Sequence, residues 1–212
     1  MPKNRDNDKK ESWEWRFFHK EEKLKNKTLE RINFNLPAPQ YKTYIDQYVI
    51  IPKLSHNIKL RKIKNEILKE LHIKTLIKNQ NNIFKFSQKT IISFPIVKDD
   101  LLKLKNLKIL NISNKAKSID SLKNIIDIEN NAYLLASVKK KLTRYNIKKN
   151  ISKLRKKIRL EFANIQINNI PFKTISLKCT SMEVIIEVLQ KLDMLDLEST
   201  NYVNYIKSLE NT

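Results

Sequence analysis

The clearest pattern along the chain is an alternation of apolar and polar residues between positions 137 and 179. Three runs rich in β-branched and aromatic residues occur there. A basic link separates the first two runs, and the turn residues Asn168–Pro171 separate the last two. Because successive residues of a strand point to opposite faces of a sheet, these runs predict three consecutive antiparallel strands.

The middle run shows what the two faces carry. Ile158, Leu160 and Phe162 fall on one face, whereas Arg159 and Glu161 fall on the other. The first run also carries ordered charge, since Lys139 and Lys141 share one face and Lys140 and Arg144 share the opposite one. Strands of this kind belong either to a half-solvated sheet or to the wall of a polar cavity.

A further alternating run begins at position 12, close to the start of the chain. It places Trp13, Trp15 and Phe17 on one face and Glu14, Arg16 and Phe18 on the other. Additional strands are predicted at positions 41–51, 58–63, 66–71 and 83–96. A short helix is the alternative at 66–71.

Helical spacing of apolar residues predicts three helices, at positions 99–110, 118–128 and 182–192. The aromatic stretch 199–207 is not typical of a linker. Several strands, two helices, more strands and one helix indicate an α+β fold with a largely antiparallel sheet, open or closed as a β-barrel, and flanking helices. We expect a disordered basic tail at 1–11 and a single domain at 12–212.

Composition narrows the chemistry. The formal net charge of +21 favours anionic partners, although a lysine surplus can also be plain solvated surface. The chain has no glycine, which excludes glycine-rich phosphate loops, and its one cysteine, Cys179, excludes an internal disulfide. We expect Cys179 in the core, and the three histidines at the surface or at strand ends rather than as ligands. Without an apolar leader or a long apolar run, we expect a soluble, cytoplasmic protein with no membrane contact.

Basic residues on strand faces are the main candidates for binding. If the strands close around a cavity, these cations converge and can hold a phosphate chain by charge-assisted hydrogen bonds. A carboxylate such as Glu14 or Glu161 in that cavity needs a cation or a divalent metal beside it. The alternative is that all these charges face water. The candidate cations are Lys59, Arg61, Lys69, Lys139, Lys141 and Arg144.

The order of motifs resembles that of the CYTH-like, triphosphate tunnel metalloenzyme superfamily over nearly the whole chain. Glu14-Trp15-Arg16 resembles the second half of the family's Glu-x-Glu-x-Lys strand. Runs 58–61 and 66–69 resemble its early basic strands, and runs 138–145 and 160–162 its later basic and acidic strands. The helix at 182–192 and the ending at 201–207 resemble the close of these domains.

The resemblance implies an antiparallel barrel with a charged tunnel that binds triphosphates, polyphosphate or other phosphorylated small molecules. It implies Mg²⁺ or Mn²⁺ as cofactor and activities such as triphosphatase, thiamine triphosphate hydrolysis or adenylate cyclase. By position, Glu14 and Glu161 would be catalytic and metal-binding. Arg16, Lys59, Arg61, Lys69, Lys139, Lys141 and Arg144 would contact the substrate.

Three departures from the family pattern concern the metal. Ser12 stands where the first Glu of the signature is expected, Arg16 replaces its Lys, and Lys178 stands in the last core strand, which commonly supplies a carboxylate. Fewer carboxylates lower the affinity for Mg²⁺, which prefers hard oxygen ligands. An active phosphohydrolase and a binder with a reduced set of metal ligands therefore both stay open.

Two other functions stay open. A nucleic-acid-binding protein, such as an RNA-binding or ribosome-associated one without enzymatic activity, fits the net charge and aromatic residues that could stack on bases (Trp13, Trp15, Phe17 and Tyr145). A partner-binding module could use the helix at 182–192, although its apolar stripe is more simply packed on the sheet. Nothing in the sequence indicates an oligomeric state.

Overall fold

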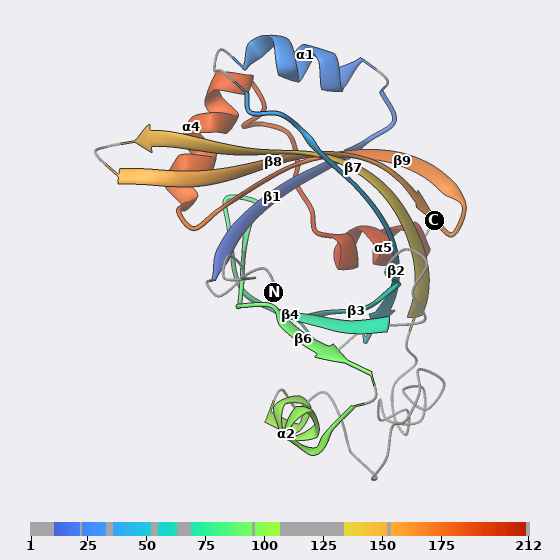
Figure 1. Ribbon diagram of the computed structural model, residues 1–212. Coiled ribbons are helices and arrows are strands. Elements are labelled where there is room, and N and C mark those ends of the chain that lie inside the picture. Colours follow the sequence, from blue (N-terminus) through green and yellow to red (C-terminus); the bar gives the residue numbers. More distant parts are fainter. Residues whose placement is uncertain are drawn as a thin grey trace.

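The computed structural model describes residues 11–21, 23–32, 36–51, 55–62, 69–94, 96–106, 134–151 and 154–210. Over these residues the chain forms one strongly curved antiparallel sheet with helices around it (Figure 1). The strands are β1 Ser12–His19, β2 Gln40–Ile50, β3 His56–Lys62, β4 Lys69–Gln80, β5 Ile83–Phe86, β6 Thr90–Ser93, β7 Leu134–Ile151, β8 Leu154–Ile167 and β9 Ile170–Cys179. The helices are α1 Leu24–Arg31, α2 Lys98–Asn106, α4 Met182–Leu192 and α5 Tyr202–Glu210.

The sheet closes on itself. Its strand order is β3-β2-β7-β8-β9-β1-β5-β4, and a further pairing between β3 and β4 joins the two ends into an eight-stranded barrel. β6 extends the sheet along β4. The antiparallel barrel with flanking helices that the sequence predicts is therefore confirmed.

Asparagine and aspartate occupy the left-handed backbone positions in this glycine-free chain. Asn81 and Asn82, with φ of 51° and 57°, turn the chain from β4 into β5. Asn168 and Asn169, with φ of 48° and 71°, form the predicted turn between β8 and β9. Tight hairpin turns need positive φ, and asparagine tolerates it better than most residues with a Cβ. Asp193, with φ of 55°, ends α4 in the same way.

Apolar side chains pack on the outer faces of the barrel strands. Trp15, Leu160 and Ile175 of β1, β8 and β9 form one buried cluster with Ile185 and Leu189 of α4. On the opposite side of the barrel, a second cluster joins apolar residues of β2, β3, β4 and β6 with Leu104 of α2. Much of the apolar core therefore lies between the barrel strands and the helices outside them. The inner faces of these strands are then free to carry polar side chains.

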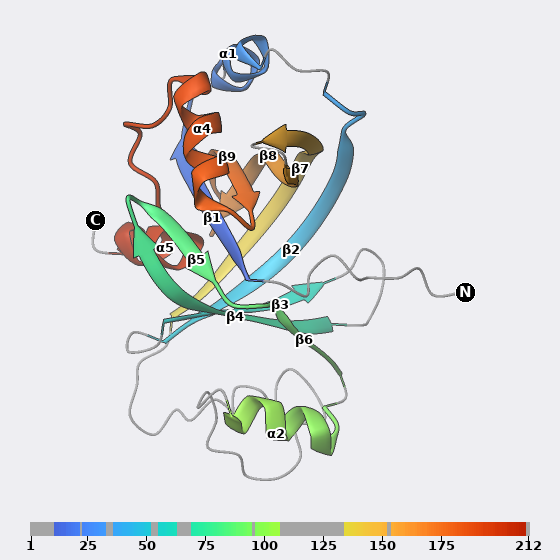
Figure 2. The same cartoon turned by 90° about the vertical axis from the view of Figure 1, so that its left-hand side faces the viewer.

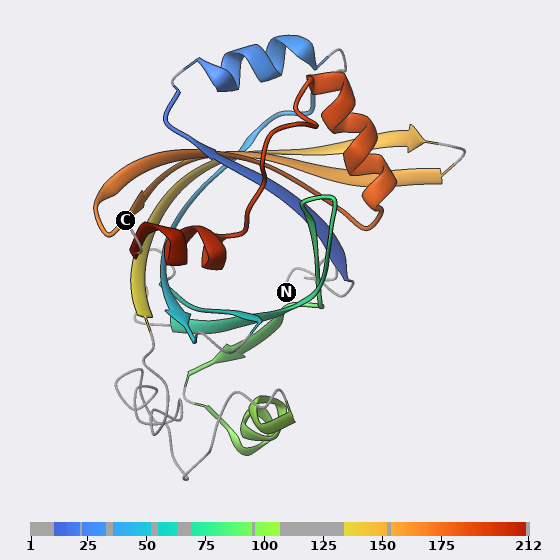
Figure 3. The same ribbon diagram turned by 180° about the vertical axis from the view of Figure 1, so that it is seen from behind.

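Helix α5 covers one end of the barrel (Figures 2 and 3). Its residues Tyr202, Val203 and Ile206 form a third buried cluster, together with Val138 and Leu142 of β7 and other inward residues. The aromatic tail at 199–207 is therefore part of the fold and contributes to the barrel interior.

Most predicted elements are confirmed. The helix at 182–192 has the predicted bounds, and the predicted strands at 12–19, 41–51 and 58–63 match β1, β2 and β3. Strand β4 extends to Gln80, well beyond the predicted end at 71. The predicted helix at 118–128 lies outside the described residues, and so does the predicted tail at 1–11 apart from Glu11. None of the described helices has both the length and the apolar character needed to cross a bilayer.

Candidate functional site

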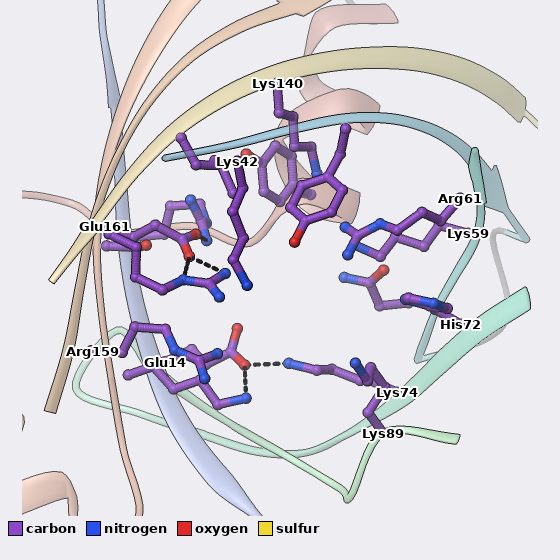
Figure 4. A pocket seen from close by; sticks show the side chains of 18 of the residues that line it. Glu14, Lys42, Lys59, Arg61, His72, Lys74, Lys89, Lys140, Arg159 and Glu161 are labelled. Carbon is purple, nitrogen blue, oxygen red and sulfur yellow. Dashed lines mark hydrogen bonds and ion pairs between the residues drawn. The ribbon is translucent and has the colours of Figure 1, made fainter. Parts of the chain in front are cut away.

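A polar cavity of about 560 Å³ lies inside the barrel. Side chains from seven of the barrel strands, from β6 and from the start of α5 line it. Among the described residues, ten lysine or arginine side chains and three glutamates contribute to the lining. Figure 4 shows Arg159, Glu161 and Glu14 on one side of the cavity, and Lys59 and Arg61 on the opposite side.

Asp46 of β2 lies at the centre of the cations on the side that carries Lys59 and Arg61. Its carboxylate is 0% exposed and accepts hydrogen bonds from Lys59 Nζ at 3.0 Å and Arg61 Nε at 2.7 Å. Lys140 Nζ lies 2.9 Å from the same carboxylate. Burial alone would raise the pKa of Asp46, but Lys140, Lys59 and Arg61 hold it well below its usual range. One carboxylate cannot neutralise three cations, so this side of the cavity stays positive.

The two lysines beside Asp46 differ in how they hold their protons. Burial lowers the pKa of Lys59 well below its ordinary value, and Lys140 and Arg61 act in the same direction against Asp46. For Lys140, the attraction of Asp46 and of Tyr202 outweighs burial and raises the pKa. Lys140 therefore holds its proton firmly, whereas Lys59 holds its proton less tightly beside the same carboxylate.

Tyrosine rings form the wall behind these cations. The Lys140 ammonium donates to the Tyr48 hydroxyl at 2.7 Å and lies 3.7 Å from the centroid of the Tyr202 ring. The Arg16 guanidinium lies 4.6 Å from that same centroid, and the Arg61 guanidinium lies 3.7 Å from the centroid of Tyr44. Aromatic faces attract cations without neutralising them. The wall thus stabilises buried positive charge that is still available to an anion.

Glu161 of β8 holds two arginines. Arg144 donates to its Oε2 from Nε at 2.9 Å and from Nη2 at 2.7 Å. Arg16 Nη2 lies 3.7 Å from Oε1, and Arg16 Nη1 donates to Thr174 Oγ1 at 3.0 Å. Burial would raise the pKa of Glu161, but Arg144 and Arg16 outweigh it and lower the pKa. The carboxylate is thus charged and already paired.

Glu14 of β1 is paired with two lysines. Lys74 of β4 donates a hydrogen bond to its Oε1, and Lys178 Nζ, from the directly opposite position on β9, lies 3.3 Å from the same oxygen. Both lysines hold the pKa of Glu14 below its usual range although burial acts to raise it. Burial lowers the pKa of Lys74 to about 8 against the attraction of Glu14.

Several polar groups of the lining have no partner among the described residues. Arg159 Nε and Tyr202 Oη are buried without a hydrogen bond. Lys42 reaches into the cavity from β2 (Figure 4), and no ion pair or hydrogen bond joins its ammonium to a described residue. Burial, Arg144 and Arg159 lower its pKa. The Lys42 ammonium is thus a donor that points into the cavity, where an anionic ligand would satisfy it.

His72 corrects the expectation that the histidines lie at the surface or at strand ends. It is 3% exposed, lies within β4 and lines the cavity, with Nε2 at 2.7 Å from Glu70 Oε2. Burial lowers its pKa to about 4 against the opposing effect of the hydrogen bond to Glu70, so the ring is neutral near pH 7. Its Nε2–H then donates to Glu70, and the buried Nδ1 is an acceptor with no partner in the described part of the chain.

The structure brings together six of the nine predicted site residues, namely Glu14, Arg16, Lys59, Arg61, Arg144 and Glu161. Lys139 and Lys141 are exposed and lie outside the lining, because the alternation of β7 turns Lys140, Leu142 and Arg144 inward instead. The backbone of Lys69 begins β4, and its side chain is outside the described part of the structure.

The sequence predictions omitted five of the residues that matter most: Lys42, Asp46, Lys74, Lys140 and Arg159. The sequence could have indicated Asp46, since it is the one acidic residue on the face of β2 that also carries Tyr44 and Tyr48. It could also have indicated Lys140, which shares a face with Arg144. Nothing in the sequence indicated Lys74, because the predicted strand stopped at 71.

The donor set does not fit the divalent metal centre that the resemblance implies. Glu14 is already bound by two lysines, and Glu161 by two arginines. Ser12, at the position of the missing first Glu, has no carboxylate to add. Among the described residues, no group of three or more His, Cys, Asp or Glu side chains is arranged to hold a metal ion. A metal at either glutamate would have to displace cations in a site with an excess of them.

Comparison with known structures finds proteins with a similar barrel. The chain superposes on the PH1012 protein from Pyrococcus horikoshii OT3 with a TM-score of 0.51 and 13% identity, covering 91% of this chain and 98% of that one. It superposes equally well, at 0.51 and 10% identity, on an adenylyl cyclase-like protein from Hippeastrum, HpAC1, which is described as having a dominant triphosphatase activity; 93% of this chain and 95% of that one are covered. The chain has the fold of the CYTH-like, triphosphate tunnel proteins. We therefore call the cavity the tunnel. No protein-family model and no curated protein sequence matches the chain.

Proposed function

We propose that the tunnel binds a ligand that carries a triphosphate or polyphosphate group. The observation that carries this proposal is the charge of the lining, where ten lysine or arginine side chains outnumber three glutamates among the described residues. Burying so many like charges is costly unless an anion compensates them. A chain of phosphates supplies several negative charges at short spacing, and it can reach both sides of the tunnel at once.

The two sides of the tunnel would have different roles. The Asp46 side would hold one phosphate through Lys59, Arg61 and Lys140, whose combined charge exceeds that of the carboxylate. Lys42 and Arg159 would bind the next phosphate, because both line the tunnel and lie on the side away from Lys59 and Arg61. Charge-assisted hydrogen bonds of this kind are short and strong, and arginine adds planar geometry.

Hydrolysis of the bound ligand is a second candidate function, because the Hippeastrum protein of similar fold is described as having triphosphatase activity. Glu14 and Glu161 are the catalytic candidates by position, but each is held by two cations in this chain. A carboxylate in such a pair is a weak base for activating water, because the same cations lower its pKa. We therefore propose a binding protein, in which these glutamates fix the orientation of the cations.

Calorimetry with inorganic triphosphate, pyrophosphate and phosphate tests the binding proposal. We expect saturable binding of one triphosphate per chain, with affinity rising from phosphate to triphosphate. Lys42→Met should weaken triphosphate binding about 10- to 100-fold, because it removes one charged hydrogen-bond donor. Lys103→Met is the matched control, since Lys103 is exposed on α2 and pairs with Asp100 outside the tunnel.

A phosphate-release assay completes the test. Inorganic triphosphate, ATP and thiamine triphosphate are each incubated with the protein, with and without Mg²⁺ or Mn²⁺. We expect no release above the protein-free blank. Release that Glu161→Gln abolishes would make the tunnel an active site, and absence of saturable binding would remove the binding proposal itself.

A further inference from the structure

Lys178 and Lys74 meet at the one carboxylate that β1 retains of the family's acidic pattern. Lys178 faces Glu14 from the adjacent strand β9, in direct register, and Lys74 reaches the same oxygen from β4 across the tunnel. Figure 4 shows the two contacts to Glu14 and, above them, the arginine contacts to Glu161. Two ammonium groups on one carboxylate leave a net positive charge at the tunnel wall.

We propose that Lys74 and Lys178 replace a divalent metal in this tunnel, so that the phosphate chain binds without Mg²⁺ or Mn²⁺. This inference rests on the proposed function, because it concerns how the same ligand is held. Glu14 anchors both ammonium groups on one oxygen, Oε1, and fixes their direction. A phosphate oxygen then receives hydrogen bonds from the lysines where it would otherwise coordinate the metal.

The geometry explains why a metal would not compete. Mg²⁺ and Mn²⁺ prefer oxygen ligands, and protonated lysine offers donors only. Glu161 cannot compensate, because Arg144 and Arg16 occupy it. The position before Glu14 on the same face of β1 holds Ser12, which is buried and not part of the lining. An ion entering the tunnel would also meet the repulsion of the surrounding lysine and arginine side chains.

A consequence is that Mg²⁺ should weaken binding. A phosphate chain that already carries Mg²⁺ has less negative charge to offer the cations of the tunnel. We therefore expect inorganic triphosphate to bind more weakly in 5 mM Mg²⁺ than in EDTA at the same ionic strength. The measurement is calorimetric affinity under the two conditions, and Mn²⁺ electron paramagnetic resonance of the protein alone reports uptake of metal.

The outcomes are distinguishable. Tighter binding in EDTA, without stoichiometric Mn²⁺ uptake, supports the inference, and equal affinity in the two conditions contradicts it. Binding that requires Mg²⁺, or one Mn²⁺ bound per chain, overturns it while the proposed function survives. No binding in either condition removes the proposed function and the inference together.

A single substitution can create the metal dependence. Lys178→Glu places a second carboxylate beside Glu14, on the strand where the resembling family commonly has one. We expect K178E to lose triphosphate affinity about 10- to 100-fold in EDTA and to recover part of it with Mn²⁺. Lys178→Met is the matched variant, because it removes the ammonium without adding an oxygen ligand. It should show the same loss with no recovery, and recovery in both variants would contradict the proposal.

Discussion

Asp46 lies buried among three cations on the side of the tunnel formed by β2, β3 and β7. Lys59, Arg61 and Lys140 approach it within 2.7–3.0 Å. The carboxylate permits these strands to place like charges next to each other inside the barrel. Its loss would leave three desolvated cations facing one another.

Asp46→Asn should therefore destabilise the unliganded protein by about 3–5 kcal/mol, because breaking a buried ion pair leaves uncompensated charge. Urea unfolding monitored by tryptophan fluorescence measures the change. Glu187→Gln is the control, since the Glu187–Lys191 pair lies on α4 with both side chains partly exposed. It should cost no more than about 0.5 kcal/mol. Equal losses in the two variants would contradict the role assigned to Asp46.

Lys74 links pH to binding and to stability with opposite signs. Burial lowers its pKa to about 8, whereas a lysine in the unfolded chain titrates near about 10.4. The unfolded chain therefore binds more protons between these values, and the contribution of Lys74 to stability rises with pH across that window. Only the protonated side chain attracts phosphate, so affinity falls as pH rises through about 8.

We expect the affinity for inorganic triphosphate to fall about tenfold between pH 7 and pH 9, in addition to any change due to the ligand. Lys74→Arg should remove this component, because arginine keeps its charge throughout the range. Calorimetric titrations of both proteins at each pH make the comparison, since titration of the ligand is common to them. A profile that is identical in the two proteins would show that Lys74 does not contact the phosphates.

Face assignment within a strand could be predicted from the sequence, but the closure of the barrel decides which face is inside. Alternation correctly separates Lys139 from Lys140 on β7. The sequence does not show that the face with Lys140 and Arg144 points into the tunnel. That choice depends on α4 and α2 covering the other faces, which are packing relations between distant segments.

Helix α4 shows why both ends of some elements can be predicted from the sequence. Its apolar stripe, Glu183 in the first turn and Lys191 in the last give the bounds 182–192 from the sequence alone. Strand β4 is the contrasting case, since both its faces carry mixed residues and its end at Gln80 is set by the hairpin with β5. Lys74 was missed for this reason.

Ile185→Ala tests whether α4 supports the barrel from outside. Ile185 is 0% exposed, so removing its side chain should cost about 2–5 kcal/mol of unfolding free energy. Ile186→Ala, at the partly buried neighbouring position, should cost less. Because Ile185 packs on the outer face of the sheet, affinity for inorganic triphosphate should change less than twofold. A loss of affinity like that of Lys42→Met would show that the outer layer shapes the tunnel.

Positive charge in the molecule as a whole is divided between the tunnel and the exterior. Lys139 and Lys141 are exposed on the outer face of β7, and their partners on β2 include the exposed Ile45. Of the four aromatic residues first considered for base stacking, Trp15 and Tyr145 are buried, at 1% and 9% exposed, whereas Trp13 and Phe17 are partly buried. The two basic regions can therefore be tested separately.

A double variant, Lys139→Ala/Lys141→Ala, should leave the affinity for inorganic triphosphate within twofold of the original protein, because neither side chain lines the tunnel. The same variant should weaken any salt-sensitive binding of a single-stranded RNA, since exposed lysines bind phosphates through counterion release. Lys42→Met should show the reverse pattern. Fluorescence anisotropy with a labelled oligonucleotide and calorimetry with triphosphate, both repeated at two salt concentrations, measure the two activities. If the double variant lost triphosphate binding while Lys42→Met kept it, the ligand would bind on the exterior of the barrel, and the nucleic-acid interpretation would replace the tunnel proposal.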